Sequence, residues 1–417
     1  MEVSLPGMTK ELINKVLERG VIQVYPYKEE LRRALEKDPS KLTFYLGVDP
    51  TASFLHLGHI VPVRKLEQLR MLGARVILLI GDFTATVGDP TDKLSARKVL
   101  THQEVQSNAK NYIKLISPIL KIKRGWFGKG AEIRRNNDWL GKMSLSDFMV
   151  AASEISRDRL DDREMFRERE RQGLAIHLNE FVYPVLQGLD SVYMNVDGEV
   201  GGNDQTFNML VGRTFMQRLM LKAGGLVKRS GNPTKEKFVI SVKLLVDPEG
   251  KKMGKSEGNA VALDAKPNDM YGAVMSWPDG VVKDAFELLT DVEMDVVEKM
   301  SKDLSPRDFK ANLALEITKI FHGESKAKGA EAEFNKVFQS HGIPEDIKTV
   351  KIDVDKLPAA ELLVKLGLAA SNSEARRVIE QGGMSIGDET ITDPAQEINI
   401  KKGLIVRRGK RQFAKIA

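Results

Sequence analysis

Two apolar segments on either side of a helix-length stretch constrain the fold of this chain most strongly. KLTFYLGV (41–48) has the composition of a strand, and ARVILLIGDF (74–83) is almost wholly apolar, as in a strand buried on both faces of a parallel sheet. Residues 57–72 have helical spacing and stop at Gly73, where a helix can end. Together they form a βαβ unit, which predicts an α/β fold with a doubly wound parallel sheet.

Length and composition limit the class of protein. With 417 residues the chain is long enough for several domains, and it contains no cysteine, which excludes disulfides and thiolate metal sites. The start, MEVSLPGMTKELINK, lacks the apolar run of a signal peptide, and no stretch approaches the ~20 apolar residues of a membrane span. We therefore expect a cytoplasmic protein that does not contact membranes.

Changes in composition divide the chain into four parts. Residues 1–225 should hold the parallel sheet with a helical insertion, and 226–339 a helical domain. A polar linker is expected at 340–354, followed by a compact domain at 355–417. The net charge is only +6, but residues 401–417 contain seven Lys or Arg and no Asp or Glu. This concentration of positive charge indicates an anionic partner.

The segment GVDPTASFLHLGH (47–59) places His56 and His59 at the predicted strand-to-helix turn. The pair alone is weak evidence, because polar residues are common at a helix start and a zinc site would need a third ligand. At the carboxyl edge of a parallel sheet, however, a helix N-terminus favours anions, and imidazole N–H groups would bind phosphate oxygens there. Gly58 would let a flat base lie against the backbone. The turn indicates a nucleotide site without a protein-bound metal.

A second basic motif lies about two hundred residues later, in DPEGKKMGKSEGN (247–259). Taken alone, Lys252 and Lys255 would be read as part of an exposed glycine-rich loop. Together with the histidine turn, they predict a site that holds a triphosphate and neutralises charge as pyrophosphate leaves.

Polar residues also follow one face of a predicted helix. Tyr183, Gln187 and Asp190 stand at i, i+4 and i+7 in YPVLQGLD (183–190). Such a stripe on an otherwise apolar helix favours a ligand pocket, with a buried structural network as the alternative.

The motifs GVDPTASFLHLGH and KMGKS resemble the HIGH and KMSKS signatures of class I aminoacyl-tRNA synthetases. With Tyr45, GDPTDKLSAR (88–97) and YPVLQGLD, the chain resembles the bacterial tyrosyl-tRNA synthetases over nearly its whole length. This implies a Rossmann-like core, a helical domain and a small α+β RNA-binding domain. The chain departs from some members in having Glu199 and Val200 before GGNDQ, and Gly254 in place of the signature serine.

The resemblance implies a role for each candidate site residue. Tyr45 and Asp190 would bind the phenol of tyrosine, an arrangement that would leave polar groups unpaired with phenylalanine. The residues implied to bind the rest of tyrosine are Asp89, Tyr183 and Gln187 at the ammonium group and Gln205 at the carboxylate. The residues implied to contact ATP are Gly47, Asp49, Thr51, His56, Gly58, His59, Gly202, Asp204, Lys252 and Lys255. The residues implied in catalysis are His56, His59, Lys252, Lys255, Lys93 and Arg97.

The terminal domain resembles an RNA-binding domain named after a ribosomal small-subunit protein. The match lies mainly in SNSEARRVIEQGG (371–383), where Ser373 is expected to cap a helix. A solvated amphipathic helix is the alternative. The residues implied to contact tRNA phosphates are Arg376, Arg377, Arg407, Arg408, Lys410 and Arg411.

The predicted function is therefore an ATP-dependent tyrosine–tRNA ligase. It would use Mg²⁺ with ATP, form tyrosyl-adenylate and pyrophosphate, transfer tyrosine to the 3′ end of its tRNA, and act as a homodimer. One alternative is a tryptophanyl-tRNA synthetase, against which Tyr45 and the Tyr-x3-Gln-x2-Asp spacing argue. Others are an RNA-binding protein on an inactive synthetase scaffold, which would not need both lysines and both histidines, and a nucleotidylyltransferase.

Overall fold

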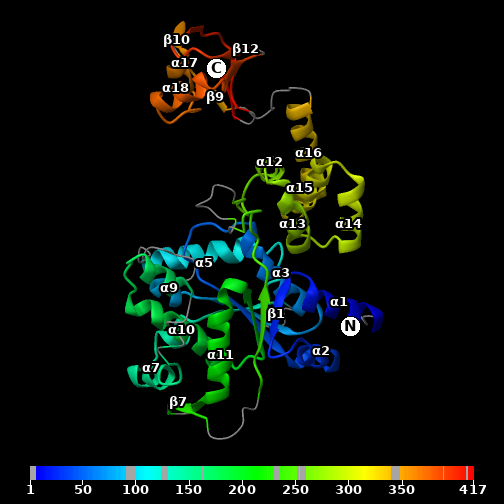
Figure 1. Cartoon of the computed structure of the whole chain (residues 1–417), viewed down its shortest axis with the longest axis vertical. Coiled ribbons are helices and arrows are strands. Elements are labelled where there is room, and N and C mark those ends of the chain that lie inside the picture. Colours follow the sequence, from blue (N-terminus) through cyan, green and yellow to red (C-terminus); the bar gives the residue numbers. More distant parts are fainter. Residues whose placement is uncertain are drawn as a thin grey trace. The chain divides into compact units, whose positions relative to one another are not determined.

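The chain forms two compact units in the computed structural model, Met1–Ala327 and Lys328–Ala417 (Figure 1). The structure describes residues 6–90, 100–123, 130–156, 158, 160, 164–222, 224–229, 235–250, 253, 260–339, 348–352, 354–387, 389–409 and 412–417. Among these residues, no helix is long and apolar enough to cross a membrane. The three boundaries between the four parts expected from composition stay predictions.

A six-stranded sheet lies at the centre of the first unit, in the order β1-β8-β5-β2-β3-β4. Its strands are β1 (Val21–Tyr25), β2 (Thr43–Val48), β3 (Arg75–Ile80), β4 (Glu132–Arg135), β5 (Gly198–Gly202) and β8 (Phe238–Val242). Only the β1–β8 pair is antiparallel; the other four pairs are parallel. The predicted doubly wound parallel sheet is confirmed, with β2, the first parallel strand, between β3 and β5.

Helices cover both faces of this sheet. Figure 1 shows α10 and α11 on one side and α1 and α2 on the other. The helices of this part are α1 (Pro6–Glu18), α2 (Lys28–Lys37), α3 (Ile60–Met71), α4 (Thr84–Val87), α5 (His102–Ile116), α6 (Asn137–Leu140), α7 (Leu145–Ala152), α9 (Glu164–Arg171), α10 (Leu178–Met194) and α11 (Thr206–Arg218). A hairpin of β6 (Leu219–Lys222) and β7 (Gly225–Lys228) follows α11. Val185 and Leu189 of α10 pack with Phe215 of α11 in a buried apolar cluster.

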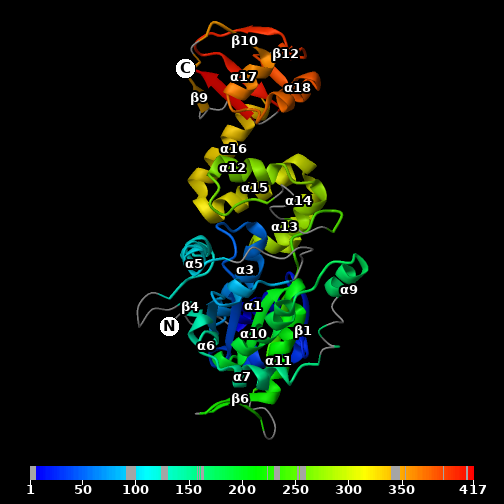
Figure 2. The ribbon, with the colours of Figure 1, turned by 90° about the vertical axis from the view of Figure 1, so that its left-hand side faces the viewer.

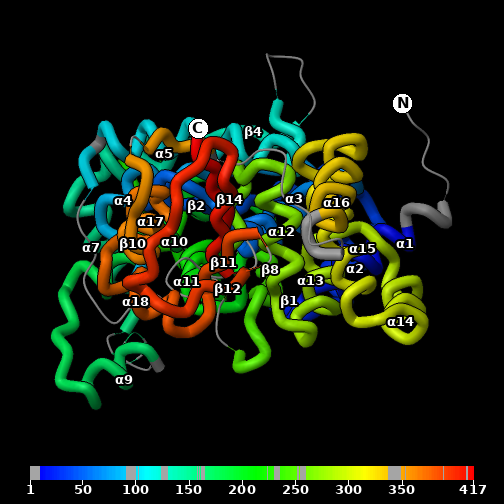
Figure 3. The backbone as a smooth tube through the Cα atoms, turned by 90° about the horizontal axis from the view of Figure 1, so that it is seen from above, coloured from blue at the N-terminus to red at the C-terminus, as the bar shows by residue number. Residues whose placement is uncertain are grey.

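The helical part of the first unit follows the sheet. It contains α12 (Pro267–Met275), α13 (Val282–Leu289), α14 (Met294–Asp303) and α15 (Pro306–His322), of which α13, α14 and α15 lie side by side (Figures 2 and 3). Arg19, just after α1, donates to the main-chain carbonyls of Phe286, Glu287, Thr290 and Val292. Because these carbonyls lie at and just beyond the end of α13, one guanidinium attaches the helical part to the sheet-bearing part.

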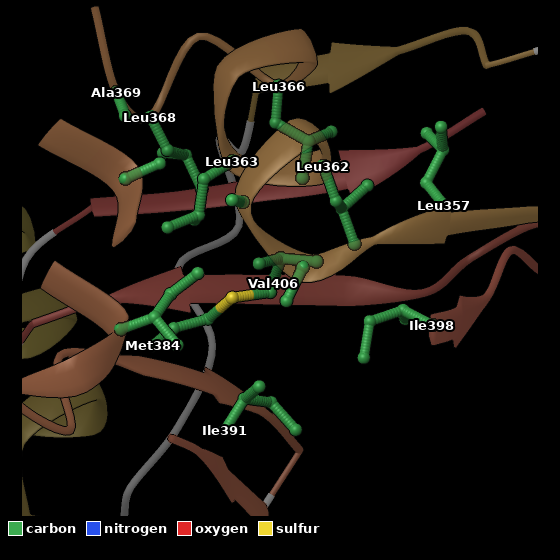
Figure 4. Close-up of a cluster of buried hydrophobic side chains, with 14 of the residues drawn as sticks. Leu357, Leu362, Leu363, Leu366, Leu368, Ala369, Met384, Ile391, Ile398 and Val406 are labelled. Atoms are coloured by element: carbon green, nitrogen blue, oxygen red, sulfur yellow. The ribbon is translucent and has the colours of Figure 1, made fainter. Parts of the chain in front are cut away.

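The second unit begins within α16 (Glu324–Gln339) and has its own core. Its five-stranded sheet runs β12-β11-β14-β15-β9, with β9 (Lys348–Val350), β11 (Met384–Ile386), β12 (Glu389–Ile391), β14 (Ile405–Arg408) and β15 (Gln412–Ile416). A short pair, β10 (Lys356–Pro358) and β13 (Glu397–Asn399), and the helices α17 (Ala359–Lys365) and α18 (Asn372–Glu380) complete it. Leu362, Leu363, Met384 and Val406 are fully buried in its centre (Figure 4), and the expected small α+β domain is confirmed.

Candidate active site

The candidate site lies at the carboxyl ends of β2 and β5. The strand order continues to β8 and β1 on one side of this pair and to β3 and β4 on the other. Open α/β sheets bind ligands at such a switch in strand order. Asp49 follows β2 directly, and Asp204 lies in the 3₁₀ turn η3 (Asn203–Gln205) after β5. Most of the predicted ligand-binding residues therefore come from segments that meet at one edge of the sheet.

The two histidines form a compact pair at the entrance to α3. Their ring centroids are 3.8 Å apart, and the main-chain N–H of His56 donates to Nδ1 of His59 across 3.2 Å. Gly58 lies between them in the 3₁₀ turn η2 (Leu57–His59), and a Cβ there would stand 3.2 Å from the His56 ring. Glycine thus permits the close turn, and it leaves His59 exposed and His56 partly exposed.

The segments on either side of the lysine loop lie against this turn. Leu57 N–H donates to the carbonyl of Val261 (3.0 Å), and Leu263 N–H donates to that of Leu55 (2.9 Å). The carbonyl oxygen of Met253 lies 3.8 Å from the position of a Cβ at Gly58. Lys252 and Lys255 lie outside the described residues, as do Lys93 and Arg97. The two signature segments nevertheless meet in space at Met253 and Val261.

Asp49 ties three elements together. Its carboxylate accepts from the hydroxyl of Tyr183 on α10 (2.9 Å) and from that of Thr84 on α4 (2.7 Å). A Cβ at Gly81 would stand 1.9 Å from Asp49 Oδ1, so that only glycine allows this approach. Burial and the charge of Asp49 raise the pKa of Tyr183 well above its usual value. Asp49 therefore positions Tyr183, in addition to the ATP contact that the resemblance implies for Asp49.

Asp190 is buried and accepts two hydrogen bonds that the sequence did not reveal. Trp139 Nε1 donates to Oδ1 (2.8 Å) and Asn136 Nδ2 donates to Oδ2 (3.3 Å). Burial raises the pKa of this carboxyl well above its usual value, while both donors oppose that shift. Tyr45 is fully buried, and its hydroxyl shares a 3.0 Å hydrogen bond with the hydroxyl of Ser191, the residue after Asp190.

The remaining polar residues of the predicted tyrosine pocket form two more pairs. Gln205 Nε2 donates to Asp89 Oδ2 (2.7 Å), which brings together the residues expected at the ammonium and carboxylate groups. Gln187 Nε2 donates to Glu199 Oε1 across 3.0 Å. Glycine at 202 allows the close approach of Asp204, because a Cβ there would lie 2.4 Å from its Oδ1 atom. The structure therefore joins residues spread over more than a hundred positions of sequence.

Two of the ATP candidates, Gly47 and Thr51, are placed by the backbone alone. Gly47 is the fifth residue of β2, and Thr51 N–H donates to the carbonyl of Asp49 across 2.8 Å. Both lie at the carboxyl end of β2, where the resemblance implies an ATP contact.

Sequence reasoning missed several residues of this site: Trp139, Asn136, Ser191, Glu199 and Lys237. A hydroxyl next to a candidate carboxylate, as in Asp190-Ser191, was a signal that could have been used. Lys237 gave none, because a lysine just before a strand is ordinarily read as exposed, whereas here it is completely buried.

The basic residues of the second unit differ in how they are held. Arg376 and Arg377 are exposed on α18. Arg407 donates to the hydroxyl of Ser385 (2.8 Å), and Arg408 donates to Glu374 (2.7 Å) and to the carbonyl of Leu368. Lys410 and Arg411 lie outside the described residues.

The cap of α18 was predicted wrongly. Ser371, rather than Ser373, is the N-cap, and its hydroxyl accepts from Glu374 N–H at 3.2 Å. The reason is spacing: a cap hydroxyl reaches the N–H three residues later, and Ser371 and Glu374 have that separation.

Within the described parts of the chain, no group of three or more His, Asp or Glu side chains could hold a metal ion.

Comparison with known proteins gives consistent matches along the chain. The family described as class I tRNA synthetases (W and Y) matches residues 37–339, and the C-terminal domain of tyrosine–tRNA ligases matches residues 339–416. Tyrosine–tRNA ligase from Thermotoga maritima is 39% identical over 98% of both chains. The same ligase from Aquifex aeolicus is 36% identical over 98% of this chain and 99% of its own.

Solved structures support the fold. A C-terminally truncated mitochondrial tyrosyl-tRNA synthetase from Aspergillus nidulans covers 80% of this chain and 95% of its own, with a TM-score of 0.64 and 24% identity. A tyrosyl-tRNA synthetase complexed with L-tyrosine from Archaeoglobus fulgidus covers 78% of this chain and 99% of its own, with a TM-score of 0.56 and 20% identity.

Proposed function

The chain belongs to the tyrosine–tRNA ligases of the class I tRNA synthetases, and on that premise we propose which of its residues perform each step. The reaction joins tyrosine to its tRNA at the expense of ATP. The tyrosine carboxylate attacks the α-phosphate of ATP, a bond forms between carboxylate oxygen and phosphorus, and pyrophosphate leaves. A ribose hydroxyl at the 3′ end of the tRNA then displaces AMP from the adenylate.

Tyr45 and Asp190 recognise the phenol of tyrosine. The phenol needs an acceptor for its O–H and a donor for its oxygen, and a buried carboxylate beside a tyrosine hydroxyl supplies both. Support comes from the burial of both side chains and from the two donors, Trp139 and Asn136, that orient the carboxylate of Asp190. A substrate without the hydroxyl leaves these groups unpaired, which is why the site rejects phenylalanine.

Asp89, Tyr183 and Gln187 bind the ammonium group, and Gln205 orients the carboxylate for attack. The observation that favours this assignment is the Gln205–Asp89 hydrogen bond, because it brings an ammonium ligand and a carboxylate ligand side by side. Gln187 offers a further acceptor: its Oε1 atom is buried and has no hydrogen-bond partner among the described residues.

ATP lies over the histidine turn, in contact with Gly47, Asp49, Thr51, Gly58 and the η3 turn that carries Asp204. His56, His59, Lys252, Lys255, Lys93 and Arg97 stabilise the negative charge that develops on the leaving pyrophosphate. The observation that carries this proposal is the contact of Val261 with Leu57, because it joins the end of the lysine loop to the histidine turn. No side chain has to act as nucleophile or base, so catalysis is positioning and charge stabilisation.

Mg²⁺ enters with the ATP phosphates, since hard cations of this kind are usually held by substrate phosphates and few protein ligands. The enzyme works in the cytoplasm. The tRNA phosphates are contacted by the basic residues of the second unit, chiefly the exposed Arg376 and Arg377.

The working form is a homodimer. Leu145 and Met149 stand one helical turn apart on α7 and are 76% and 59% exposed, and Leu178 at the start of α10 is 78% exposed. Exposed apolar side chains on neighbouring helices are typical of an interface.

ATP–pyrophosphate exchange with tyrosine, tryptophan, phenylalanine or no amino acid tests the assignment without tRNA. Exchange with tyrosine alone is expected, and D190N should lose most of the preference for tyrosine over phenylalanine. Exchange with tryptophan, or an unchanged preference in D190N, would overturn Tyr45 and Asp190 as the phenol ligands.

A further inference from the structure

A buried ion pair lies next to Gln187, one of the residues proposed to bind the ammonium group. Lys237 Nζ contacts Glu199 Oε2, and the two side chains are 0% and 2% exposed. Lys237 also donates to the main-chain carbonyl of Met209 (3.0 Å), and its Nζ lies 5.6 Å from the centre of the Tyr45 ring. Burial lowers the pKa of Lys237, and the adjacent carboxylate of Glu199 opposes this shift.

The backbone is shaped to enclose this pair. A Cβ at Gly212 on α11 would stand 2.4 Å from Lys237 Nζ and 2.7 Å from the hydroxyl of Ser191. The lysine therefore occupies a space that only a glycine on α11 leaves open. Two buried charges need such close support, because an unpaired charge in a protein interior is strongly destabilising.

The pair determines what Gln187 can do. Glu199 forms an ion pair with Lys237, and the carboxylate of an ion pair can only accept hydrogen bonds. Its Oε2 atom is taken by the lysine, so Oε1 faces Gln187 and accepts from Nε2 across 3.0 Å. The amide of Gln187 can therefore adopt one orientation only. Its opposite end is the carbonyl Oε1, buried and without a partner among the described residues.

We propose that Glu199 and Lys237 are positioning residues for tyrosine activation: they hold the amide of Gln187 so that its carbonyl oxygen is presented to the ammonium group of tyrosine. This inference rests on the proposed role of Gln187 in binding that group. The reverse orientation would present an NH₂ donor to a cation that has only donors, and binding would be lost.

The same chemistry predicts an unusual result for the E199Q variant. Lys237 needs an acceptor, so it takes the oxygen of the new glutamine amide and leaves the NH₂ end facing Gln187. Gln187 must then turn its own carbonyl toward that NH₂ group and its nitrogen toward the substrate. We expect the KM for tyrosine in pyrophosphate exchange to rise by about tenfold to a hundredfold, the range for a hydrogen bond to a charged group. The KM for ATP should change by less than about twofold.

A second substitution should reverse this effect. In E199Q/K237M no cation demands the oxygen of the new amide, which is free to turn its carbonyl back toward Gln187. The KM for tyrosine is then expected to return to within about threefold of that of the unchanged enzyme. If the two substitutions had only structural effects, the KM for tyrosine in the double variant would instead rise by at least as much as the two separate effects combined. A KM for tyrosine that is as high as in E199Q, or higher, would overturn the proposal.

A substrate analogue makes the test independent of how well K237M folds. Hydroxyphenylpropionate has the phenol and carboxylate of tyrosine but no ammonium group, and its inhibition constant should be the same in E199Q and in the unchanged enzyme. If E199Q weakens the analogue as much as tyrosine, the pair acts on the shape of the pocket and the proposal fails.

The variant Q187M separates this proposal from the function on which it rests. Q187M should weaken the binding of tyrosine but not the binding of the analogue. E199Q should have the same effect. If Q187M weakens neither, the role of Gln187 at the ammonium group is wrong. If Q187M selectively weakens the binding of tyrosine and E199Q does not, Gln187 binds the ammonium group but Glu199 and Lys237 do not position it.

Discussion

The main-chain N–H of Leu57 donates to the carbonyl oxygen of Val261 across 3.0 Å. One of these residues lies in the histidine turn and the other just beyond the lysine loop, about two hundred positions later. His56 and Ala262 form a β-bridge next to them, so the two segments run antiparallel for a few residues. The described residues that follow the lysine loop are thereby held beside the proposed phosphate site.

Removal of one lysine should slow activation and spare tyrosine binding. We expect Lys255→Ala to lower the rate of tyrosyl-adenylate formation by ~10²–10³, as for the loss of one transition-state contact elsewhere. Single-turnover kinetics would give the rate and equilibrium dialysis the tyrosine affinity. Lys326→Ala, at an exposed position on α16, is the matched control. An equal loss of tyrosine affinity would contradict the role assigned to Lys255.

Trp139 should set the pH at which tyrosine is recognised. The indole N–H lowers the pKa of Asp190, which burial raises, so that W139F should raise this pKa further. The ionised carboxylate accepts the phenol O–H, and kcat/KM for tyrosine should therefore rise with pH through the pKa of Asp190, at a higher pH in W139F. Tyr193→Phe, which keeps the ring stacked on Trp139, should leave the pH profile in place. Profiles that coincide for W139F and the unchanged enzyme would refute this coupling.

Two asparagines of α5 should support the loop that precedes the histidines. Asn108 Nδ2 donates to the carbonyl of Pro50 (3.0 Å) and Asn111 Nδ2 to that of Ser53 (2.8 Å). In N108A/N111A we expect kcat/KM for ATP to fall by roughly fivefold to 150-fold, the range for two ordinary hydrogen bonds. Asn312→Ala loses a similar bond to Asp308 on α15 and serves as the control. Equal effects of the two variants on ATP would show that α5 does not position the loop.

Lys65 should make the protein more stable as pH rises above neutrality. Burial lowers its pKa from 10.5 to about 7, and as a neutral amine it still has two N–H groups for the carbonyls of Lys15 and Arg19. Between these two pKa values the unfolded chain binds more protons than the folded one, so the free energy of unfolding increases with pH.

Titration of this one group raises the free energy of unfolding by at most about 1.4 kcal/mol per pH unit. Urea unfolding at pH 7 and pH 9 should show a gain of about 2 kcal/mol for the unchanged protein relative to K65M. The same pH dependence in both proteins would mean that other groups cause it.

Local patterns were sufficient for the core of the fold and for naming most of the candidate site residues. The almost wholly apolar run at 74–83 favoured burial on both faces, and this property can be read from the strand's own residues. The polar stripe Tyr183, Gln187 and Asp190 followed from helical geometry. The N-cap of α18 was missed by two residues, although the Ser371–Glu374 spacing was present in the sequence.

The sequence by itself determined the parallel sheet, the two signature segments and the stripe on α10, because each depends on residues that are close along the chain. Only the tertiary structure decided what surrounds the candidate residues. Trp139 and Asn136 donate to Asp190 although they lie about fifty positions away in the sequence. Lys237 is buried together with Glu199, with which it forms an ion pair. Burial of a charge depends on its partner, and the partner is chosen by packing between distant segments, which no local pattern encodes.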